Sequence, residues 1–237
     1  MPAGTAENVI CDDSLGRTLD AVEQLVFDDR TLGRSDRLTV AAWIARRQGL
    51  PGAKSGSFAA FPTELADGFV AFTGERFTHA SARHIIGEEA CRALRKLDVD
   101  DAEVLAALSR ADEGLVQAVA LAEHDPRYGN NPGAYCCTKC SVGMWRNLLA
   151  GGLDRRHERL ERGVGEFLRS SRLGDGKWRA FPFWYTVLAL VEMDLPEARD
   201  ELLYAAPVLE RAVGRTGAAT PYARRRNDLA RRALERV

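Results

Sequence analysis

Two stretches of the chain share one pattern of aromatic, glycine and proline positions. Positions 43–62 read WIARRQGLPGAKSGSFAAFP, and positions 167–182 read FLRSSRLGDGKWRAFP. Each has an aromatic and an aliphatic residue, three further residues, a Gln or Arg, a loop, Gly-x-aromatic and then Ala-Phe-Pro. Because the two stretches lie about half a chain length apart, we predict a single domain over residues 1–237, built from two pseudo-repeat halves of about 1–118 and 119–237. The alternative is that glycine, phenylalanine and proline coincide by chance in two turns.

The rest of the chain has the helix start and stop signals of an all-helical protein. Residues that cap helix N-termini precede the helical stretches, and alternating strand patterns of useful length are absent. The sharpest signal is Asn131-Pro132, with proline at the first position of a helix that Gly151-Gly152 would end. We expect an all-α fold of about ten to twelve helices joined by short loops. The helices are expected to begin near Ser14, Ser35, Thr63, Thr78 or Ser81, Asp98, Asn131, Asp154, Pro182, Pro196 and Thr220.

Bulk composition narrows the class of protein. The 237 residues are 46% hydrophobic and 28% charged with a net charge of −1, so bulk charge predicts neither nucleic-acid nor membrane binding. The N-terminus lacks the basic and apolar segments of a secretory signal, and no apolar run approaches the roughly 18–20 residues of a membrane span. Five cysteines without a disulfide-scaffold spacing predict a reducing, cytoplasmic location.

The C-terminal segment, residues 223–237, is rich in arginine. Its arginines recur without interleaved aromatic residues, and the charge of the whole chain is balanced. We therefore expect a solvated amphipathic helix here, and contact with RNA or DNA is the less favoured alternative.

The repeated pattern resembles the motif of squalene and terpene cyclases and of related prenyltransferase repeats. That motif has a basic and a small residue, an aromatic and an aliphatic residue, a Gln, and then Gly-x-Trp. The matching positions are Arg162-Gly163, Phe167-Leu168, Gly176 and Trp178 in the second half, and Trp43-Ile44, Gln48, Gly56 and Phe58 in the first. Arg172 stands where the family has Gln, and Phe58 where it has Trp. The resemblance implies an α/α toroid, a ring of helical hairpins around an apolar cavity, in which the Gln ties a helix end to the loop and the Trp packs over it.

An aspartate cluster extends the resemblance. Asp98-x-Asp100-Asp101 is similar to the Asp-x-Asp-Asp motif of class II terpene cyclases, which implies that Asp100 would protonate an alkene or epoxide. Asp98 and Asp101 would tune this acid, which must stay protonated through burial and a neighbouring carboxylate. The alternative is that Asp98 caps a helix and the other carboxylates favour the positive end of its dipole.

Aromatic residues are the candidates for a substrate-binding wall, because their π faces stabilise carbocations. The apolar small molecule expected as partner would be isoprenoid-like. The alternative is plain core packing. The candidate residues are Trp145, Trp178, Phe181, Phe183, Trp184 and Tyr185.

Cysteines and histidines offer a second kind of chemistry. Cys137 and Cys140 could be half of a zinc site completed by His124 or His157, or they could be small apolar residues on a helix face. A reactive thiol is a further alternative, since Cys136 and Cys137 lie near the expected helix start. The cofactor stays open between zinc and magnesium.

A histidine and a glutamate one helical turn apart stand out in the segment 79–96. His84 and Glu88 would suit an acid/base pair or two metal ligands, although solvated pairs at this spacing are commoner.

Three functions compete on these residues. The first is a terpene-cyclase-like enzyme that acts on an isoprenoid-type substrate by acid-initiated cyclisation or isomerisation. The second is a non-catalytic helical-repeat protein that binds a protein partner or an apolar ligand. The third is a zinc- or thiol-dependent enzyme centred on Cys136, Cys137 and Cys140.

Overall fold

A computed structural model describes residues 5–128, 131–214 and 220–237. These residues form ten α-helices and one two-stranded hairpin, which confirms the all-α prediction. The helices are α1 (Leu15–Phe27), α2 (Arg34–Ala45), α3 (Pro62–Asp67), α4 (His79–Leu97), α5 (Ala102–Glu123), α6 (Thr138–Leu149), α7 (Arg156–Arg162), α8 (Phe183–Val191), α9 (Pro196–Val213) and α10 (Pro221–Leu234). The strands are β1 (Phe69–Val70) and β2 (Arg76–Phe77).

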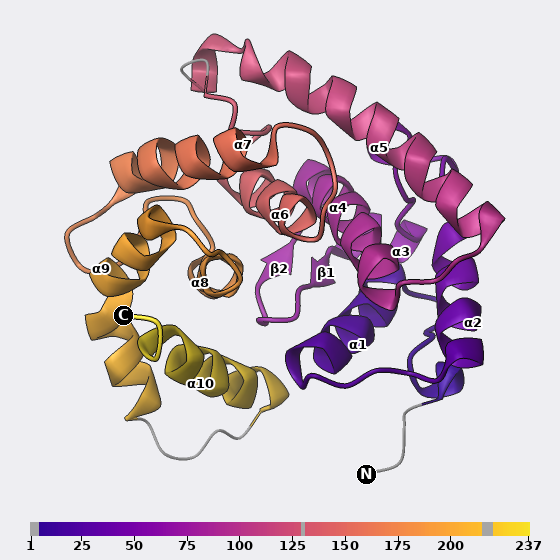
Figure 1. The fold of residues 1–237 in the computed structure, drawn as a ribbon, viewed down its shortest axis with the longest axis horizontal. Helices are drawn as coiled ribbons and strands as arrows, with labels where there is room; N and C mark the ends of the chain where they lie inside the picture. Colours follow the sequence, from indigo (N-terminus) through magenta and orange to yellow (C-terminus); the bar gives the residue numbers. More distant parts are fainter. Residues whose placement is uncertain (1–4, 129–130, 215–219) are drawn as a thin grey trace.

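Three helices lie in the interior of the molecule. Figure 1 shows α4, α6 and α8 in the middle, with α2, α5, α7, α9 and α10 around the periphery. Helix α4 packs along α6 and also contacts α1, α2, α3 and α5. Within the described ranges, every helix is too short or too polar to cross a lipid bilayer.

The predicted helix starts are partly right. Ser14 caps α1, because its side chain accepts a hydrogen bond from the Arg17 amide at 3.0 Å. Asp98 does not cap α5: it ends α4 in a left-handed conformation, and Asp101 caps α5 instead by accepting bonds from two backbone amides.

The start of α6 was predicted wrongly. Asn131 and Pro132 do not begin a helix, and α6 starts only at Thr138, after a loop in which Cys136 has a φ of +57°. The Trp145 indole donates to the Gly133 carbonyl oxygen at 2.7 Å, and the Arg159 guanidinium donates to the Pro132 carbonyl oxygen at 2.9 Å. These bonds from buried side chains hold the loop against α6 and α7, and they override the proline start signal.

A short hairpin was also missed by the sequence analysis. Residues 69–70 and 76–77 pair antiparallel, and the first of these strands lies where the helix after Thr63 was expected to continue. Two residues per strand are too few to produce an alternating pattern.

The two repeated stretches close their loops with the same kind of backbone bridge, as their shared pattern suggests. Phe58 is bridged antiparallel to Gln48, and Trp178 is bridged in the same way to Arg172. In both loops the residue after the Gln or Arg donates its amide to the carbonyl of the residue before the aromatic, at 2.9 Å. Gly56 and Gly176 both have positive φ, of +68° and +86°, which explains the shared glycine. We call these segments, 48–58 and 172–178, the twin loops. The division into halves stays a prediction.

Each twin loop is hydrogen-bonded to a different helix, and the arginine stands on a different side of the two contacts. In the first loop, Gln48 donates to the Gly56 carbonyl oxygen at 2.8 Å and accepts from Arg110 of α5 at 2.8 Å. In the second loop, Arg172 donates to the buried carboxylate of Glu201 in α9 at 2.9 Å. The guanidinium therefore comes from the helix in one case and from the loop in the other.

Trp178 shares the Glu201 carboxylate, donating its indole N–H at 2.8 Å. We expected Arg172 to replace glutamine by binding its own helix end. It instead binds a carboxylate of α9, because a guanidinium gains most from a paired, buried carboxylate.

The C-terminal helix is less solvated than predicted. Arg225 of α10 donates to Asp20 of α1 at 2.7 Å and lies 4.2 Å from the ring centre of Phe72. Arg232 lies 3.8 Å from the ring centre of Phe27, also in α1. These arginines fasten α10 to α1.

Candidate metal centre

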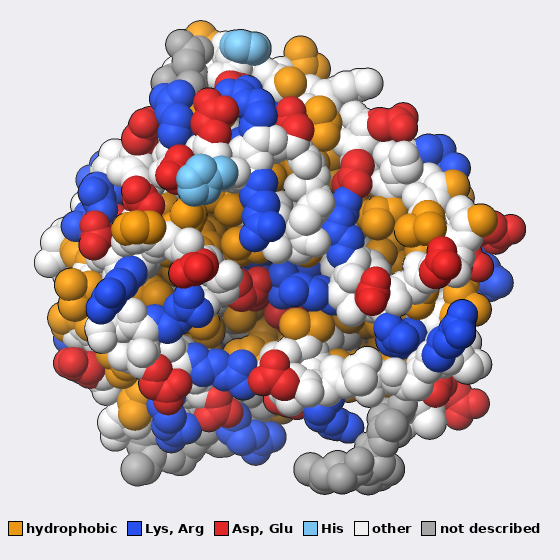
Figure 2. All heavy atoms as spheres, in the orientation of Figure 1, with side chains coloured by type: hydrophobic (Ala, Val, Ile, Leu, Met, Phe, Trp, Pro, Cys, Tyr) orange, Lys and Arg blue, Asp and Glu red, His pale blue; other side chains and the backbone are white. Residues whose placement is uncertain are grey.

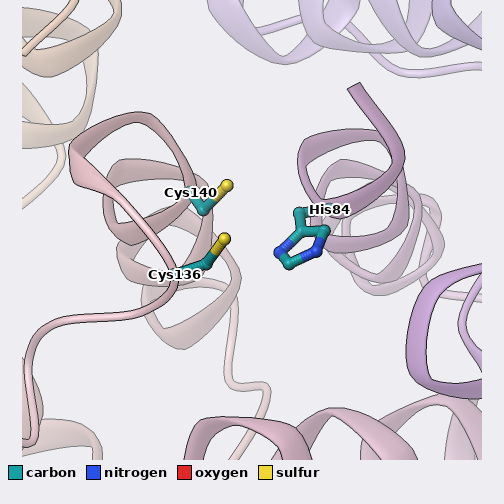
Figure 3. A group of neighbouring side chains, drawn as sticks. All are labelled: His84, Cys136 and Cys140. Carbon is teal, nitrogen blue, oxygen red and sulfur yellow. The ribbon is translucent and has the colours of Figure 1, made fainter. Parts of the chain in front are cut away.

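Three potential metal ligands meet between α4 and α6. His84 comes from the second turn of α4, Cys136 from the loop before α6, and Cys140 from the first turn of α6. The ligand atoms of the three residues all lie within 4.8 Å of one another. Figure 3 shows the two thiols side by side, facing the imidazole ring from the other helix.

Local hydrogen bonds place the cysteines. The Tyr135 amide donates to the Ser141 hydroxyl at 2.8 Å, and the Ser141 amide donates to the Cys137 carbonyl at 2.9 Å. Together these bonds fold the loop back on the first turn of α6. His84 is brought opposite by the packing of α4 along α6, and its ring stacks on Tyr135 with a centroid distance of 5.2 Å.

His84 has the properties of an unused ligand. Its side chain is buried, and the Nδ1 atom has no hydrogen-bond partner among the described residues. Burial, together with nearby Lys54, lowers the pKa of His84 to about 4. The imidazole is therefore neutral at pH 7, which is the form that binds a metal. A buried nitrogen without a partner costs free energy that a bound ion would remove.

Cys137 adds a third thiol to the cluster. It is the N-cap residue of α6, and its Sγ lies 3.4 Å from the Sγ of Cys140. Hydrogen bonds from Cys136 and Cys140, with help from the amides of Cys140 and Lys139, hold the pKa of Cys137 well below its usual range. The same contacts, with burial, raise the pKa of Cys140. Cys137 is therefore the thiol of the cluster that loses its proton most readily.

Glu88 lies one turn after His84 and is fully buried. The Asn147 amide donates to Glu88 Oε2 at 2.7 Å, while Oε1 has no partner among the described residues. Burial raises the pKa of Glu88 to about 8, with smaller contributions from Asp112 and Glu89. The His84–Glu88 pair is therefore not the solvated pair that its spacing most often indicates.

Glu88 makes the stability of the metal-free protein depend on pH. Between its unfolded pKa of 4.5 and its folded pKa of about 8, the folded state keeps a proton that the unfolded state has lost. The free energy of unfolding therefore falls as pH rises through this window. From pH 6.5 to pH 8, wild type should lose about 2 kcal/mol of unfolding free energy relative to Glu88→Gln. A bound proton contributes about 1.4 kcal/mol per pH unit.

Urea unfolding with a chelator at the two pH values measures this change. His84 affects the pH dependence between its folded pKa of about 4 and its unfolded pKa of 6.5, which is below the pH range of this experiment. Glu103→Gln at an exposed position is the control and should give a difference independent of pH. An equal difference for Glu88→Gln at both pH values would contradict a neutral Glu88.

The ligand set selects among metals. Thiolate and imidazole ligands suit zinc and other soft or borderline ions, whereas magnesium requires oxygen ligands in octahedral geometry. Of the two cofactors expected from the sequence, the cluster fits zinc.

Two of the predicted zinc ligands lie elsewhere. Cys137 and Cys140 are in the cluster, but His124 is exposed at the end of α5. His157 is exposed on α7, where its Nε2 lies 2.9 Å from Glu161 Oε1. The histidine that does reach the cysteines is His84. Its helical pairing with Glu88 was visible in the sequence, but nothing in the spacing linked it to the cysteines.

The aspartate cluster lies on the surface. Asp98 and Asp100 are exposed, and the carboxylate of Asp101 is engaged with the Glu103 and Val104 amides. This placement agrees with the helix-end alternative in part, since Asp101 rather than Asp98 caps α5. It lacks the burial that a protonated carboxylic acid needs at neutral pH.

The predicted aromatic wall is packed ring against ring. Trp145 stacks on Phe181 at 5.9 Å, and Trp178 stacks on Phe183 at 5.7 Å between ring centroids. Tyr185 meets Phe77 edge to face at 5.2 Å, and Trp184 meets Phe183 at 5.1 Å. These contacts are those of the core-packing alternative.

A group of buried charges joins α1, α4, α6 and α8. We call the residues Glu23, Glu89, Arg92, Arg146 and Glu192 the central ion network. Arg146 donates to Glu23 and to Glu89 at 2.6 Å each, and Arg92 Nη1 lies 2.9 Å from Glu192 Oε2. Figure 2 shows acidic and basic side chains gathered in a hollow near the middle of the face that Figure 1 presents to the viewer.

The central ion network has three carboxylates for two guanidinium groups, and the pKa values of two of its carboxylates shift in different directions. Burial acts to raise the pKa of Glu23, but Arg146 and Arg92 outweigh it and the pKa is lowered. Burial raises the pKa of Glu192. A pocket of about 240 Å³ beside the network is lined by Glu23, Arg92 and Glu192 among others. No sequence signal marked these residues, because each is an ordinary charged position in its own helix.

No family model matches the chain, and neither the curated proteins nor the solved structures include one with significant similarity to it.

Proposed function

We propose that this chain is a zinc-binding helical protein whose metal is held by His84, Cys136 and Cys140. The observation that carries the proposal is that these three ligand atoms converge within 4.8 Å from separate segments of the chain. Zinc in proteins takes such thiolate and imidazole ligands. Cys137 is the candidate for the fourth ligand, since its Sγ is 3.4 Å from that of Cys140. With it, the centre has the Cys₃His set of closed structural sites.

The proposed centre has a structural role. It would fasten α4 to the loop at 131–137 and to the first turn of α6. Metal binding would also give the buried His84 nitrogen a partner. We also propose a reducing, cytoplasmic location, because the cysteine ligands must be free of disulfide bonds.

Metal analysis of the purified chain tests the proposal. We expect about one zinc ion per wild-type chain and almost none in Cys140→Ser or His84→Ala, because a site loses most of its affinity with a ligand. Cys11→Ser, at a half-buried cysteine next to Asp13, is the matched control and should keep its zinc. Circular dichroism shows whether the ligand variants fold. A folded, zinc-free wild-type chain after growth and purification with zinc would overturn the proposal.

The finer architecture is proposed on separate grounds. We propose that the helices form a toroid-like ring, supported by the peripheral helices around α4, α6 and α8 and by the matching twin loops. The isoprenoid enzyme, the protein-binding repeat and a zinc- or thiol-dependent reaction stay predictions. The packed aromatic rings and the exposed aspartates favour the first of these least.

A further inference from the structure

Two of the clustered thiols are placed for a bond with each other. Cys137 and Cys140 form the sequence Cys-Thr-Lys-Cys at the start of α6, with their Sγ atoms 3.4 Å apart. Cys137 has extended backbone dihedrals at the N-cap, and its carbonyl accepts from the Ser141 amide. A Cys-x-x-Cys segment at a helix N-terminus is a frequent site of reversible disulfide formation.

The two thiols differ in access. Cys137 is half-buried in a loop position, whereas Cys140 is fully buried against the interior. An external reagent would therefore meet Cys137 first. Cys140 is then within reach to complete the reaction from inside.

We propose that Cys137 and Cys140 form a reversible disulfide by exchange with a small disulfide such as oxidised glutathione, and that this disulfide excludes the metal. The metal half of this inference rests on the proposed function, and the dithiol half does not. Cys140 lies both in the metal cluster and in the thiol pair, and Cys137 is the candidate fourth ligand.

The exchange balances without any other reactant. The Cys137 thiolate attacks one sulfur of the external disulfide, which forms a mixed disulfide and releases one thiolate. The Cys140 thiolate then attacks Cys137 Sγ, which forms the Cys137–Cys140 bond and releases the second thiolate. The two protein thiols are oxidised, the external disulfide is reduced to two thiols, and the two protons of the protein thiols pass to the leaving thiolates.

The disulfide would remove the metal because a thiolate is the ligand and a disulfide sulfur is not. After oxidation only His84 and Cys136 would remain. Two ligands do not hold a structural zinc, which takes four. Bound zinc should in turn slow the oxidation, since it would occupy Cys140 and, as the fourth ligand, Cys137.

Peptide mapping tests the dithiol half on the full chain. The reduced, metal-free protein is treated with oxidised glutathione, blocked, and digested with trypsin, which cleaves after Lys139, between the two cysteines. We expect peptides 128–139 and 140–146 to be joined through a disulfide. Since Cys136 lies on the first peptide, the link must persist in Cys136→Ser and be lost in Cys137→Ser. Loss in Cys136→Ser, or persistence in Cys137→Ser, would assign the bond to another pair and overturn the proposal.

Zinc release tests the metal half. A chromogenic chelator should record about one zinc ion released per disulfide formed when the zinc-loaded chain is oxidised. Zinc that stays bound to the disulfide form would overturn the exclusion. A reduced chain that never binds zinc but forms the link would contradict the proposed function and leave the dithiol standing. A chain that binds zinc but never forms the link would contradict the dithiol and leave the proposed function standing.

Discussion

Replacing Arg146 by methionine is expected to lower the free energy of unfolding by about 3–5 kcal/mol, one of the largest effects of any single change in this chain. The Arg146 side chain is 1% exposed and donates to Glu23, Glu89 and Glu192. Methionine fills a similar volume but leaves these carboxylates with Arg92 as their main cation. The cost is that of a buried charge without its partner, and chemical denaturation with urea measures it.

A matched variant separates burial from charge. Arg231→Met removes an arginine whose pair with Asp228 is more than half exposed on both sides, and it should change stability by less than about 0.5 kcal/mol. Adding Glu23→Gln to Arg146→Met should recover about 1 kcal/mol or more, because it removes one uncompensated carboxylate. A cost near zero for Arg146→Met would show that the central ion network is dispensable.

Replacing Gly114 by alanine should destabilise the protein, by about 1–3 kcal/mol or more, against the usual preference for alanine in a helix. Gly114 is in the interior of α5, and an added methyl group would overlap the carbonyl group of Ser55 in the first twin loop. A backbone atom cannot move aside as a flexible side chain can. Thermal and urea unfolding would record the loss.

Gly143 in α6 is the control for this change. Its added methyl group would make ordinary contacts, at 3.4 Å or more, with Tyr185, Ile85 and Glu88. Gly143→Ala should therefore be neutral or stabilising by up to about 1 kcal/mol. If Gly114→Ala behaved in the same way, α5 would not be seated on the twin loop as closely as described.

The twin loops are the part of the fold that the sequence predicted best. Their glycine, aromatic and proline positions are local requirements of one turn, so the residues themselves carry the pattern. Their partners were not predictable. Arg110 and Glu201 lie in helices far along the chain, and nothing local to Gln48 or Arg172 indicates which charge will meet them.

The candidate metal centre was half predicted. The cysteines stood out by their density, whereas the histidine was sought among the nearest in sequence and lies instead on α4. The start of α6 was also misjudged, since Asn131-Pro132 is a good local start signal. Bonds from Trp145 and Arg159 overrule it, and they depend on the packing of α6 against α7. Tertiary contacts of this kind produce no periodic pattern in the sequence.

The contacts between α10 and α1 constrain the order in which the protein can fold. Asp20 precedes its partner Arg225 by 205 residues, and Phe27 lies as far before Arg232. During translation the face of α1 that contacts α10 must therefore wait until α10 has emerged. Contacts over such a separation form late and favour slow folding. The early helices would then be the part of the nascent chain that most needs protection from other surfaces.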